Sequence, residues 1–283
     1  MLTLTRVTTF VVLLALFVRA LQVPLQNNVV EFLKGDADAN ILLLTAHPDD
    51  ECMFFAPTVL ALAAADAGGS PQSKKHNVHS LCLSAGNADG LGDVRRDELS
   101  RSLDVLGIEA GRRQLIDHPD LQDDITLKWN KSIITQVLEP YVTQNNITVI
   151  LTFDTYGISG HPNHKSLPRG VLHFLSVFSE THTTPRPRLF ALVSHSMGDK
   201  YIGPLAALLA KLDLLVGSLV STGASGLPVF VAGIGAYRRA LSAMMQHRSQ
   251  LVWFRWLYVS FSRYMWVNEW VELLPADRVA GAA

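Results

Sequence analysis

Residues 41–51 read ILLLTAHPDDE and join an apolar run to a cluster of one histidine and three carboxylates. The run at 41–45 is typical of a buried strand, and the polar cluster begins where that strand would end. In open α/β folds, functional side chains gather outside the carboxyl ends of parallel strands. The stretch therefore predicts a parallel sheet with a polar site at its edge.

A second histidine cluster follows another apolar run. Residues 149–153 read VILTF, and residues 161–164, after a glycine-containing loop, read HPNH. Imidazole and carboxylate donors suit zinc, which takes three protein ligands in catalytic sites and leaves its fourth position to water. We predict His47, Asp50 and His164 as these ligands, although the same donors can hold another divalent metal. His47 and Asp50 share one turn, so a third donor from a distant loop is needed to enclose the ion.

Asp49 and His161 remain beside the predicted ligands. A carboxylate near the attacking water can take its proton, and a protonated imidazole can stabilise the oxyanion that forms. Protonated Asp49 can then pass its proton to the departing amine. Each motif also has a simpler interpretation, because His-Pro pairs are common in loops and acidic residues often begin helices. The occurrence of both clusters after predicted strands favours the metal site.

At these residues the chain resembles the zinc-dependent de-N-acetylases, a family that includes the N-acetylglucosaminyl-phosphatidylinositol de-N-acetylases and the bacterial LmbE-like enzymes. The resemblance covers roughly residues 40–195 by pattern and includes residues 86–92 (GNADGLG), Arg95 and the segment 153–164. Three further segments resemble the eukaryotic, phosphatidylinositol-linked branch of the family: 247–250 (HRSQ), 253–255 (WFR) and 262–264 (SRY).

The resemblance implies a substrate, partners and a location. It implies hydrolysis of the acetamide of N-acetylglucosaminyl-phosphatidylinositol to glucosaminyl-phosphatidylinositol and acetate, an early step of GPI-anchor biosynthesis. The implied partners are this glycolipid and a membrane. The implied location is the endoplasmic reticulum membrane, with a single membrane span and the catalytic domain on the cytoplasmic face.

Three more residues receive candidate roles. Arg95 stands where the resembling enzymes contact substrate, and its planar guanidinium suits sugar hydroxyls or phosphate; its simpler role is a surface ion pair with Glu98 or Glu109. Asn87 and its flanking glycines can approach the sugar or merely form a turn. Asp154 can orient a loop histidine from behind, or simply end its strand.

The alternation of apolar runs and amphipathic stretches predicts an α/β fold, a Rossmann-like three-layer arrangement with a mainly parallel sheet and helices on both faces. Right-handed crossovers would bring the loops at 46–51, 84–92 and 154–163 to one rim. We expect the strands near 41–45, 78–83, 112–116, 148–153 and 188–193. We expect the helices near 52–66, 93–106, 127–144 and 164–179.

The chain divides into three predicted parts: residues 1–24, 38–200 and 201–283. The first carries the apolar run from Val7 to Val18 and is interpreted as an uncleaved membrane anchor. The second is the catalytic α/β domain. The third is a mainly helical extension whose aromatic and cationic side chains could rest on a bilayer or pack on the main sheet.

Evidence on the compartment is divided. Two sequons, at Asn130 and Asn146, would favour a lumenal domain if they carried glycans. Two cysteines, Cys52 and Cys82, provide no disulfide framework, which favours a reducing compartment. Next to the metal motif, Cys52 is interpreted as a small buried hydrophobe rather than a ligand.

Net charge is −1 and no basic stripe is visible, so the sequence gives no support for nucleic-acid binding. Two other functions are considered. Ser196 lies in a stretch similar to a nucleophile elbow, and a serine esterase could combine it with Asp213 and His247. A catalytically inactive membrane adaptor would be expected to lack Asp49 or a ligand, and this chain keeps them all.

Overall fold

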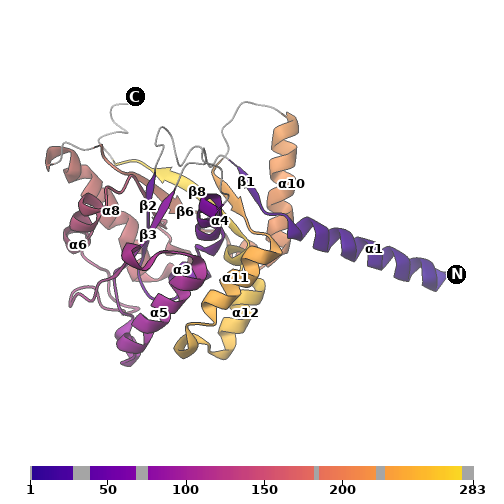
Figure 1. Ribbon diagram of the computed structural model, residues 1–283, viewed down its shortest axis with the longest axis horizontal. Helices are drawn as coiled ribbons and strands as arrows, with labels where there is room; N and C mark the ends of the chain where they lie inside the picture. Colours follow the sequence, from indigo (N-terminus) through magenta and orange to yellow (C-terminus); the bar gives the residue numbers. More distant parts are fainter. Residues whose placement is uncertain (1, 28–38, 68–75, 182–184, 221–226, 276–283) are drawn as a thin grey trace.

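The computed structural model describes residues 2–27, 39–67, 76–181, 185–220 and 227–275, and it places a mixed sheet between two layers of helices (Figure 1). The strands follow the order β1-β7-β8-β6-β5-β2-β3-β4 across an eight-stranded sheet. Their bounds are β1 Leu25–Asn27, β2 Asn40–Thr45, β3 Asn77–Cys82, β4 Arg113–Leu115, β5 Val149–Phe153, β6 Arg188–Leu192, β7 Val229–Val231 and β8 Val267–Leu273.

Five neighbouring strands, β4, β3, β2, β5 and β6, run parallel and confirm the predicted α/β core. Strand β2 lies at its centre, where Leu42 is in register with His79 on one side and Ile150 on the other. Its apolar run is buried on both faces, as expected of a central parallel strand. The five predicted strands agree with the corresponding observed strands to within one residue at every end.

Helices cover both faces of the sheet (Figure 1). On one face α4 and α5 pack with α11, and on the other α6 packs along α8. The first predicted helix is divided in two, because the chain turns between α3 and α4. The helical bounds are α1 Leu2–Gln22, α3 Asp50–Met53, α4 Ala56–Ala67, α5 Gly92–Leu106, α6 Lys131–Gln144, α7 Gly157–Gly160, α8 Pro162–Thr181, α9 Met197–Lys200, α10 Leu205–Val220, α11 Ile234–Met244 and α12 Trp253–Phe261.

The segment after residue 201 contributes strands as well as helices. Strand β8 pairs antiparallel with β6, and β7 pairs antiparallel with β8. The predicted boundary at residue 200 therefore does not separate a catalytic sheet from a helical extension. Asn268 on β8 is buried and bonds the Thr58 amide and hydroxyl at the start of α4, which ties this late strand to the first crossover.

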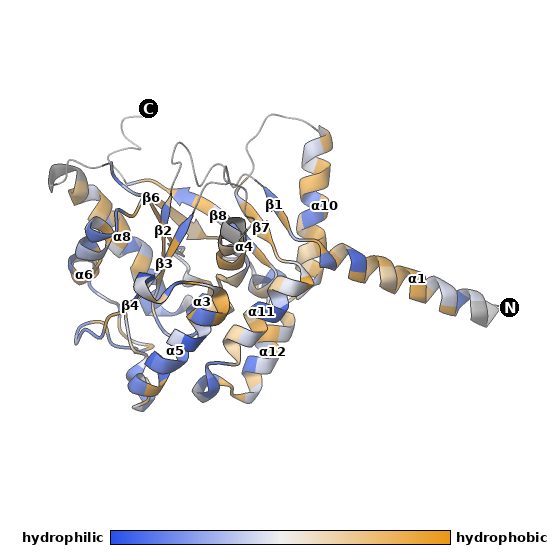
Figure 2. Ribbon diagram, viewed as in Figure 1, coloured by the Kyte–Doolittle hydropathy of each residue, from blue (hydrophilic) through white to orange (hydrophobic). Residues whose placement is uncertain are grey.

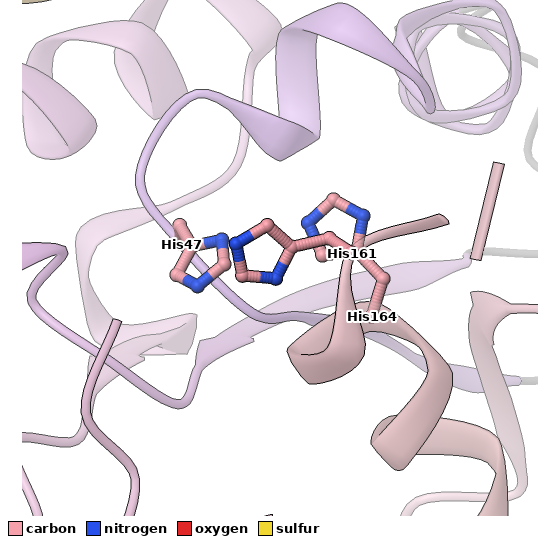
Figure 3. A group of neighbouring side chains, drawn as sticks. All are labelled: His47, His161 and His164. Carbon is pink, nitrogen blue, oxygen red and sulfur yellow. The ribbon is translucent and has the colours of Figure 1, made fainter. Parts of the chain in front are cut away.

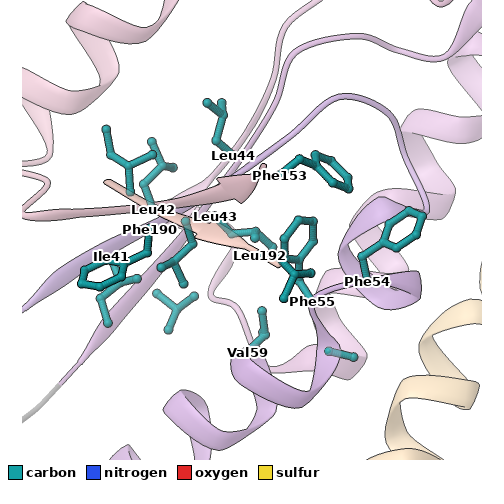
Figure 4. Close-up of a cluster of buried hydrophobic side chains, with 14 of the residues drawn as sticks. Ile41, Leu42, Leu43, Leu44, Phe54, Phe55, Val59, Phe153, Phe190 and Leu192 are labelled. Atoms are coloured by element: carbon teal, nitrogen blue, oxygen red, sulfur yellow. The ribbon is translucent and has the colours of Figure 1, made fainter. Parts of the chain in front are cut away.

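Apolar side chains from both halves of the chain fill the space between the sheet and α4 (Figure 4). Phe55 stacks on Trp270 of β8 with ring centroids 5.9 Å apart, and it meets Phe153 of β5 at 4.9 Å. Burial of large side chains such as these supplies the main driving force for folding. Strand β8 therefore contributes a large, fully buried ring to this core.

Helix α1 projects away from the rest of the molecule (Figures 1 and 2). Among the described residues, it is the one helix long and apolar enough to cross a membrane, over Thr5–Gln22, and 6% of that window is buried. It joins the sheet through β1, which pairs with β7. The Lys211 ammonium on α10 donates to the Ala20 and Val23 carbonyls at the end of α1. Helix α1 is thus attached to the folded domain at a fixed place.

Candidate active site

Three imidazoles meet at the carboxyl ends of β2 and β5 (Figure 3). His47 follows β2, while His161 and His164 lie around the start of α8. One ring nitrogen of each lies within 4.8 Å of those of the other two. The ring centroids are 4.9 Å apart for His47 and His161 and 5.4 Å apart for His47 and His164. The fold brings together histidines more than one hundred residues apart, at the rim where the sequence places them.

Asp50 presents one oxygen to this cluster. Its Oδ2 accepts hydrogen bonds from the Ala46 and His47 amides, both at 3.0 Å. Its Oδ1 lies 3.2 Å from His164 Nε2. Burial acts to raise the pKa of Asp50, but the facing His164 and the His47 amide lower it below its usual value. Asp50 is therefore an ionised carboxylate with one oxygen free to serve the site.

The hydrogen bonds of His164 define which of its nitrogens is available. Its Nδ1 lies 3.2 Å from the Gly157 carbonyl, which can only accept, so Nδ1 carries the hydrogen. Nε2 faces Asp50 Oδ1; burial acts to lower the pKa of His164, but the Asp50 carboxylate raises it above its usual value. A metal ion bound between the two would take the place of the Nε2 proton. The ring stacks on Phe153 at a centroid distance of 4.1 Å, which fixes its plane. This is the arrangement of a ligating histidine oriented from behind by a carbonyl.

The same reasoning separates His47 from His161. His47 Nε2 lies 2.9 Å from Asn163 Oδ1, while the Asn163 amide nitrogen donates to the Leu127 carbonyl. His47 therefore donates from Nε2 and keeps its lone pair on Nδ1. His161 differs because its Nδ1 accepts the Asn163 backbone amide at 3.2 Å, which places its hydrogen on Nε2.

His161 is neutral near pH 7. Burial, followed by the neighbouring His47 and His164, lowers the pKa of His161 to about 4. The lowered pKa favours a neutral His161 near pH 7, in place of the protonated form expected from the sequence. A neutral imidazole with its hydrogen on Nε2 can still donate one hydrogen bond to developing negative charge.

Asp49 has a buried carboxylate on an unusual backbone. Its φ of 108° lies in the left-handed region, where a residue with a side chain is strained. Its amide donates to Glu51 Oε2 at 3.0 Å, and its Oδ2 accepts from Arg255 Nη2 at 2.7 Å. Burial raises the pKa of Asp49, while Arg255 and Arg95 act to lower it. A carboxylate with a raised pKa suits proton transfer near neutral pH.

Arg95 and Asn87 both lie at the rim, but the first is buried and the second is exposed. Arg95 is buried, and it donates to the Gly86 and Pro48 carbonyls at 2.8 and 2.7 Å rather than pairing with Glu98 or Glu109. It also contacts Asp123 at 3.2 Å. Asn87 has an exposed side chain whose Oδ1 accepts the Gly92 amide. Arg95 thus holds the loops around the site, and Asn87 faces solvent.

Asp154 does not bond a histidine among the described residues. Its Oδ1 accepts from the Ser194 hydroxyl at 2.7 Å and from the Gly157 amide at 2.9 Å, and Oδ2 accepts the Ser194 amide. Because the Gly157 carbonyl accepts from His164, Asp154 supports that histidine through one intervening residue.

Several site residues were not predicted from the sequence. Asp123 lies 3.2 Å from His47 Nε2 and 3.8 Å from His161 Nε2, and it follows β4 in a loop without a recognisable motif. Its position after a parallel strand was the available signal. Asn163, fully buried, stands inside the quoted HPNH segment. Arg255 stands inside the quoted WFR segment, 206 residues from the Asp49 it contacts.

A second group of potential donors, Glu51, Cys52 and His247, is largely engaged in internal bonds, although His247 Nδ1 has no hydrogen-bond partner among the described residues. His247 Nε2 bonds Glu51 Oε1 at 2.7 Å, and both side chains are fully buried. The Cys52 thiol bonds the Asp49 carbonyl, and burial raises the pKa of that thiol well above its usual value. These contacts give the group a structural role beneath Asp49, in agreement with a buried Cys52.

The residues considered for a serine esterase do not come together. The Ser196 hydroxyl bonds Asp199 at 2.6 Å and accepts the Asp199 amide at the start of α9. His247 is bonded to Glu51 instead, in the interior. The triad of Ser196, Asp213 and His247 considered as an alternative is therefore not formed.

Comparison with known proteins assigns the chain to a family. Residues 42–175 match the family model described as PIG-L, GlcNAc-PI de-N-acetylase. The N-acetylglucosaminyl-phosphatidylinositol de-N-acetylase of Bos taurus is 39% identical over 227 residues, covering 80% of this chain and 81% of the relative. The chain belongs to the N-acetylglucosaminyl-phosphatidylinositol de-N-acetylase family. A probable de-N-acetylase of this family from Schizosaccharomyces pombe is 36% identical over the same share of this chain and 84% of its own length.

Solved structures share the fold of this de-N-acetylase family member. The N,N'-diacetylchitobiose deacetylase of Pyrococcus horikoshii superposes with a TM-score of 0.55 at 15% identity, covering 83% of each chain. A zinc-inhibited form of the teicoplanin deacetylase Orf2 has a TM-score of 0.50 at 13% identity, covering 83% of this chain and 99% of that one. The family is one of deacetylases, which are hydrolases acting on an amide.

The donors present fit a metal ion. Two ligands at 2.0–2.1 Å from a tetrahedral ion lie roughly 3.3 Å apart, and Asp50 Oδ1 and His164 Nε2 are 3.2 Å apart. Asp50 Oδ1 and His47 Nδ1 have lone pairs available, and His164 Nε2 would bind the ion after losing its proton. The site of this de-N-acetylase family member can therefore hold a divalent metal with nitrogen and oxygen ligands.

Proposed function

We propose that this chain hydrolyses the acetamide of N-acetylglucosaminyl-phosphatidylinositol, giving glucosaminyl-phosphatidylinositol and acetate in an early step of GPI-anchor biosynthesis. The observation that carries the proposal is the convergence of His47, Asp50 and His164 beside the buried carboxylate Asp49. The names of the relatives support the glycolipid substrate.

His47, Asp50 and His164 would hold the metal, with zinc as the ion proposed. When bound, zinc would lower the pKa of a coordinated water toward about 7 and polarise the acetamide carbonyl. The hydrogen-bond pattern supports this set, because Asp50 and both histidines have their second polar atom bonded to protein. His161 has its hydrogen on the nitrogen that would have to bind, so it is proposed as a donor rather than a ligand.

Asp49 is the proposed proton carrier. Arg255 fixes its Oδ2, and Oδ1 has no hydrogen-bond partner within the described part of the chain. Asp49 would take a proton from the attacking water as the water oxygen bonds the acetamide carbon. It would return that proton to the sugar nitrogen as the carbon–nitrogen bond breaks, which releases acetate and a free amine.

His161 would stabilise the oxyanion by donating from Nε2. Asp123, 3.8 Å from that nitrogen, would keep the ring turned toward the site. We also propose that Asn87 contacts the sugar directly, whereas Arg95 acts on substrate indirectly by holding Asp123 and the Gly86 carbonyl in place.

A membrane location is part of the proposal. Helix α1 would cross the endoplasmic reticulum membrane once, with the catalytic domain on the cytoplasmic face. The substrate lipid would then lie in the same bilayer as the anchor. The two sequons at Asn130 and Asn146 provide a direct check, since a cytoplasmic domain carries no glycans on them.

Acetate release from N-acetylglucosaminyl-phosphatidylinositol by the purified full chain tests the reaction. Activity should vanish on chelation and return with zinc.

Substitutions test the individual roles. Asp49→Asn should retain bound zinc and lose about two to four orders of magnitude in turnover, while His164→Ala should lose both the bound zinc and the turnover. Ser196→Ala serves as the control and should keep its activity. Full activity in Asp49→Asn, or full zinc occupancy in His164→Ala, would contradict these roles.

A further inference from the structure

Helix α10 presents a continuous apolar stripe to solvent. Its exposed side chains recur every three or four residues, which places them on one face of the helix. None is covered by another element in the described part of the chain, and Leu219 is the most exposed at 75%. The stripe consists of Leu205, Leu209, Leu212, Leu215, Val216 and Leu219.

Helix α12 presents large apolar side chains as well. Trp253 is 75% exposed, and Phe254, Trp256, Leu257 and Phe261 are about half exposed. Beside them lies an apolar groove of about 410 Å³, lined by Tyr201, Phe254, Leu257, Tyr258 and Phe261. Soluble monomers rarely leave a contiguous patch of this kind uncovered.

The two helices form one surface that continues into α1. The Gly203 amide, just before α10, donates to the Phe261 carbonyl at the end of α12 at 2.7 Å. Helix α10 contacts α1, and Lys211 bonds the last carbonyls of α1. In Figures 1 and 2 both helices lie on the side of the domain from which α1 projects, with α10 running across its base. A bilayer crossed by α1 would therefore meet them.

Charge in this region favours an anionic partner. Two exposed arginines, Arg238 on α11 and Arg248 just after it, lie in the segment that joins α10 to α12. Arg255 and Arg263 are instead paired with Asp49 and Glu269. A second copy docking through the same face would bring two positively charged segments together. Anionic lipid headgroups complement the surface instead.

We propose that α10 and α12 form a bilayer-docking surface, with anionic phospholipid as its partner and the apolar groove as an acyl-chain site. The assignment of the groove to acyl chains rests on the proposed lipid substrate. Tyr258 on the groove wall packs against Phe54 at 5.8 Å, and Phe54 packs against His164 at the same centroid distance. Arg255, on the same helix, bonds Asp49. The docked helix thus lies one aromatic ring from the site.

Quenching by brominated phospholipid tests the docking. The full chain is reconstituted in vesicles of phosphatidylcholine and phosphatidylinositol, with or without bromine on the phosphatidylcholine acyl chains. Bromine quenches only indoles that reach those chains, so Trp253 and Trp256 should be quenched. The double variant Trp253→Phe/Trp256→Phe should lose this bromine-dependent decrease. The matched control Trp266→Phe, which changes a buried indole, should keep it.

An undiminished quench in the double variant would overturn the proposal. So would an absence of quenching together with concentration-dependent crosslinking through residue 253, which would assign the face to a second copy.

A second readout is the rate on vesicle-borne substrate divided by the rate on its water-soluble, deacylated headgroup. This ratio should fall several-fold in Leu212→Glu/Leu215→Glu. Absence of acetate from either substrate would count against the proposed function, while the quenching would still report on docking.

Discussion

At the scale of single residues, the buried pair of Glu51 and His247 supports the strained Asp49. Glu51 receives the Asp49 amide on one oxygen, and its other oxygen bonds His247 and the Ser102 hydroxyl. His247→Ala would leave the Glu51 carboxylate buried and unpaired, so we expect a loss of about 3–5 kcal/mol in the free energy of unfolding. Denaturant unfolding in detergent measures it. The double variant Glu51→Gln/His247→Ala should lose less than His247→Ala, and an equal or larger loss would contradict the pairing.

Individual residues were predictable where they stand in a motif directly after a strand. The rim at the ends of β2 and β5 holds the five residues that the sequence places there: His47, Asp49, Asp50, His161 and His164. Asp123 and Arg255 were not assigned roles, because each reaches the site from a loop or helix whose position depends on tertiary packing. The hydrogen-bond direction that separates His161 from His164 likewise depends on backbone atoms that no sequence pattern reveals.

At the scale of elements, the close approach of α6 and α8 depends on Gly170. A Cβ added there would lie 2.4 Å from Ile134 Cγ2, far inside ordinary contact. Gly170→Ala should therefore destabilise the fold by about 1–3 kcal/mol despite the better helix propensity of alanine. Gly217→Ala on α10, where an added Cβ meets nothing within 4 Å, is the matched control and should be neutral or slightly stabilising. Thermal unfolding of both variants decides between these outcomes.

Strand β8 carries a pH-dependent contribution. Burial alone would raise the pKa of Glu269, but hydrogen bonds from His195 and the charge of Arg263 lower it below its usual value of 4.5. A lowered carboxyl pKa stabilises the fold above the unfolded value and ceases to do so as the pH falls through the folded value. Glu269→Gln should therefore cost about 1–2 kcal/mol at pH 7, and the difference from wild type should shrink below pH 4.5. A difference that is constant from pH 7 to pH 3 would refute this.

The parallel strands were predictable because β2, β5 and β6 are short, mostly apolar runs, and β3 places apolar residues between polar ones. Strand β8 was not predicted, since it reads VNEWVEL and carries three polar residues, of which Asn268 is buried and Glu269 and Glu272 form ion pairs. Asn268 is buried only because Thr58 and the Phe54 carbonyl satisfy its amide. A polar side chain with buried partners looks like a surface residue in the sequence.

At the scale of the whole molecule, the sheet requires the chain beyond residue 200. Without β8, the edge of β6 would lose its partner and Phe55 would lose the stacked Trp270. We expect a fragment of residues 38–200 to aggregate or remain unfolded, whereas residues 1–275 should fold. Far-ultraviolet circular dichroism and size exclusion compare the two. A soluble fragment with a cooperative unfolding transition would restore the predicted domain boundary.

The bond from Lys211 to the end of α1 has a consequence for how the protein would search for its substrate. A catalytic domain on a long flexible tether can diffuse through a volume above the membrane and contact headgroups at many heights. Here only Val23 and Pro24 separate α1 from β1, and Lys211 fixes that junction. If α1 spans a bilayer, the pocket is held at one height and one tilt. Encounters then become two-dimensional, and their rate would follow lateral lipid diffusion and the fluidity of the membrane.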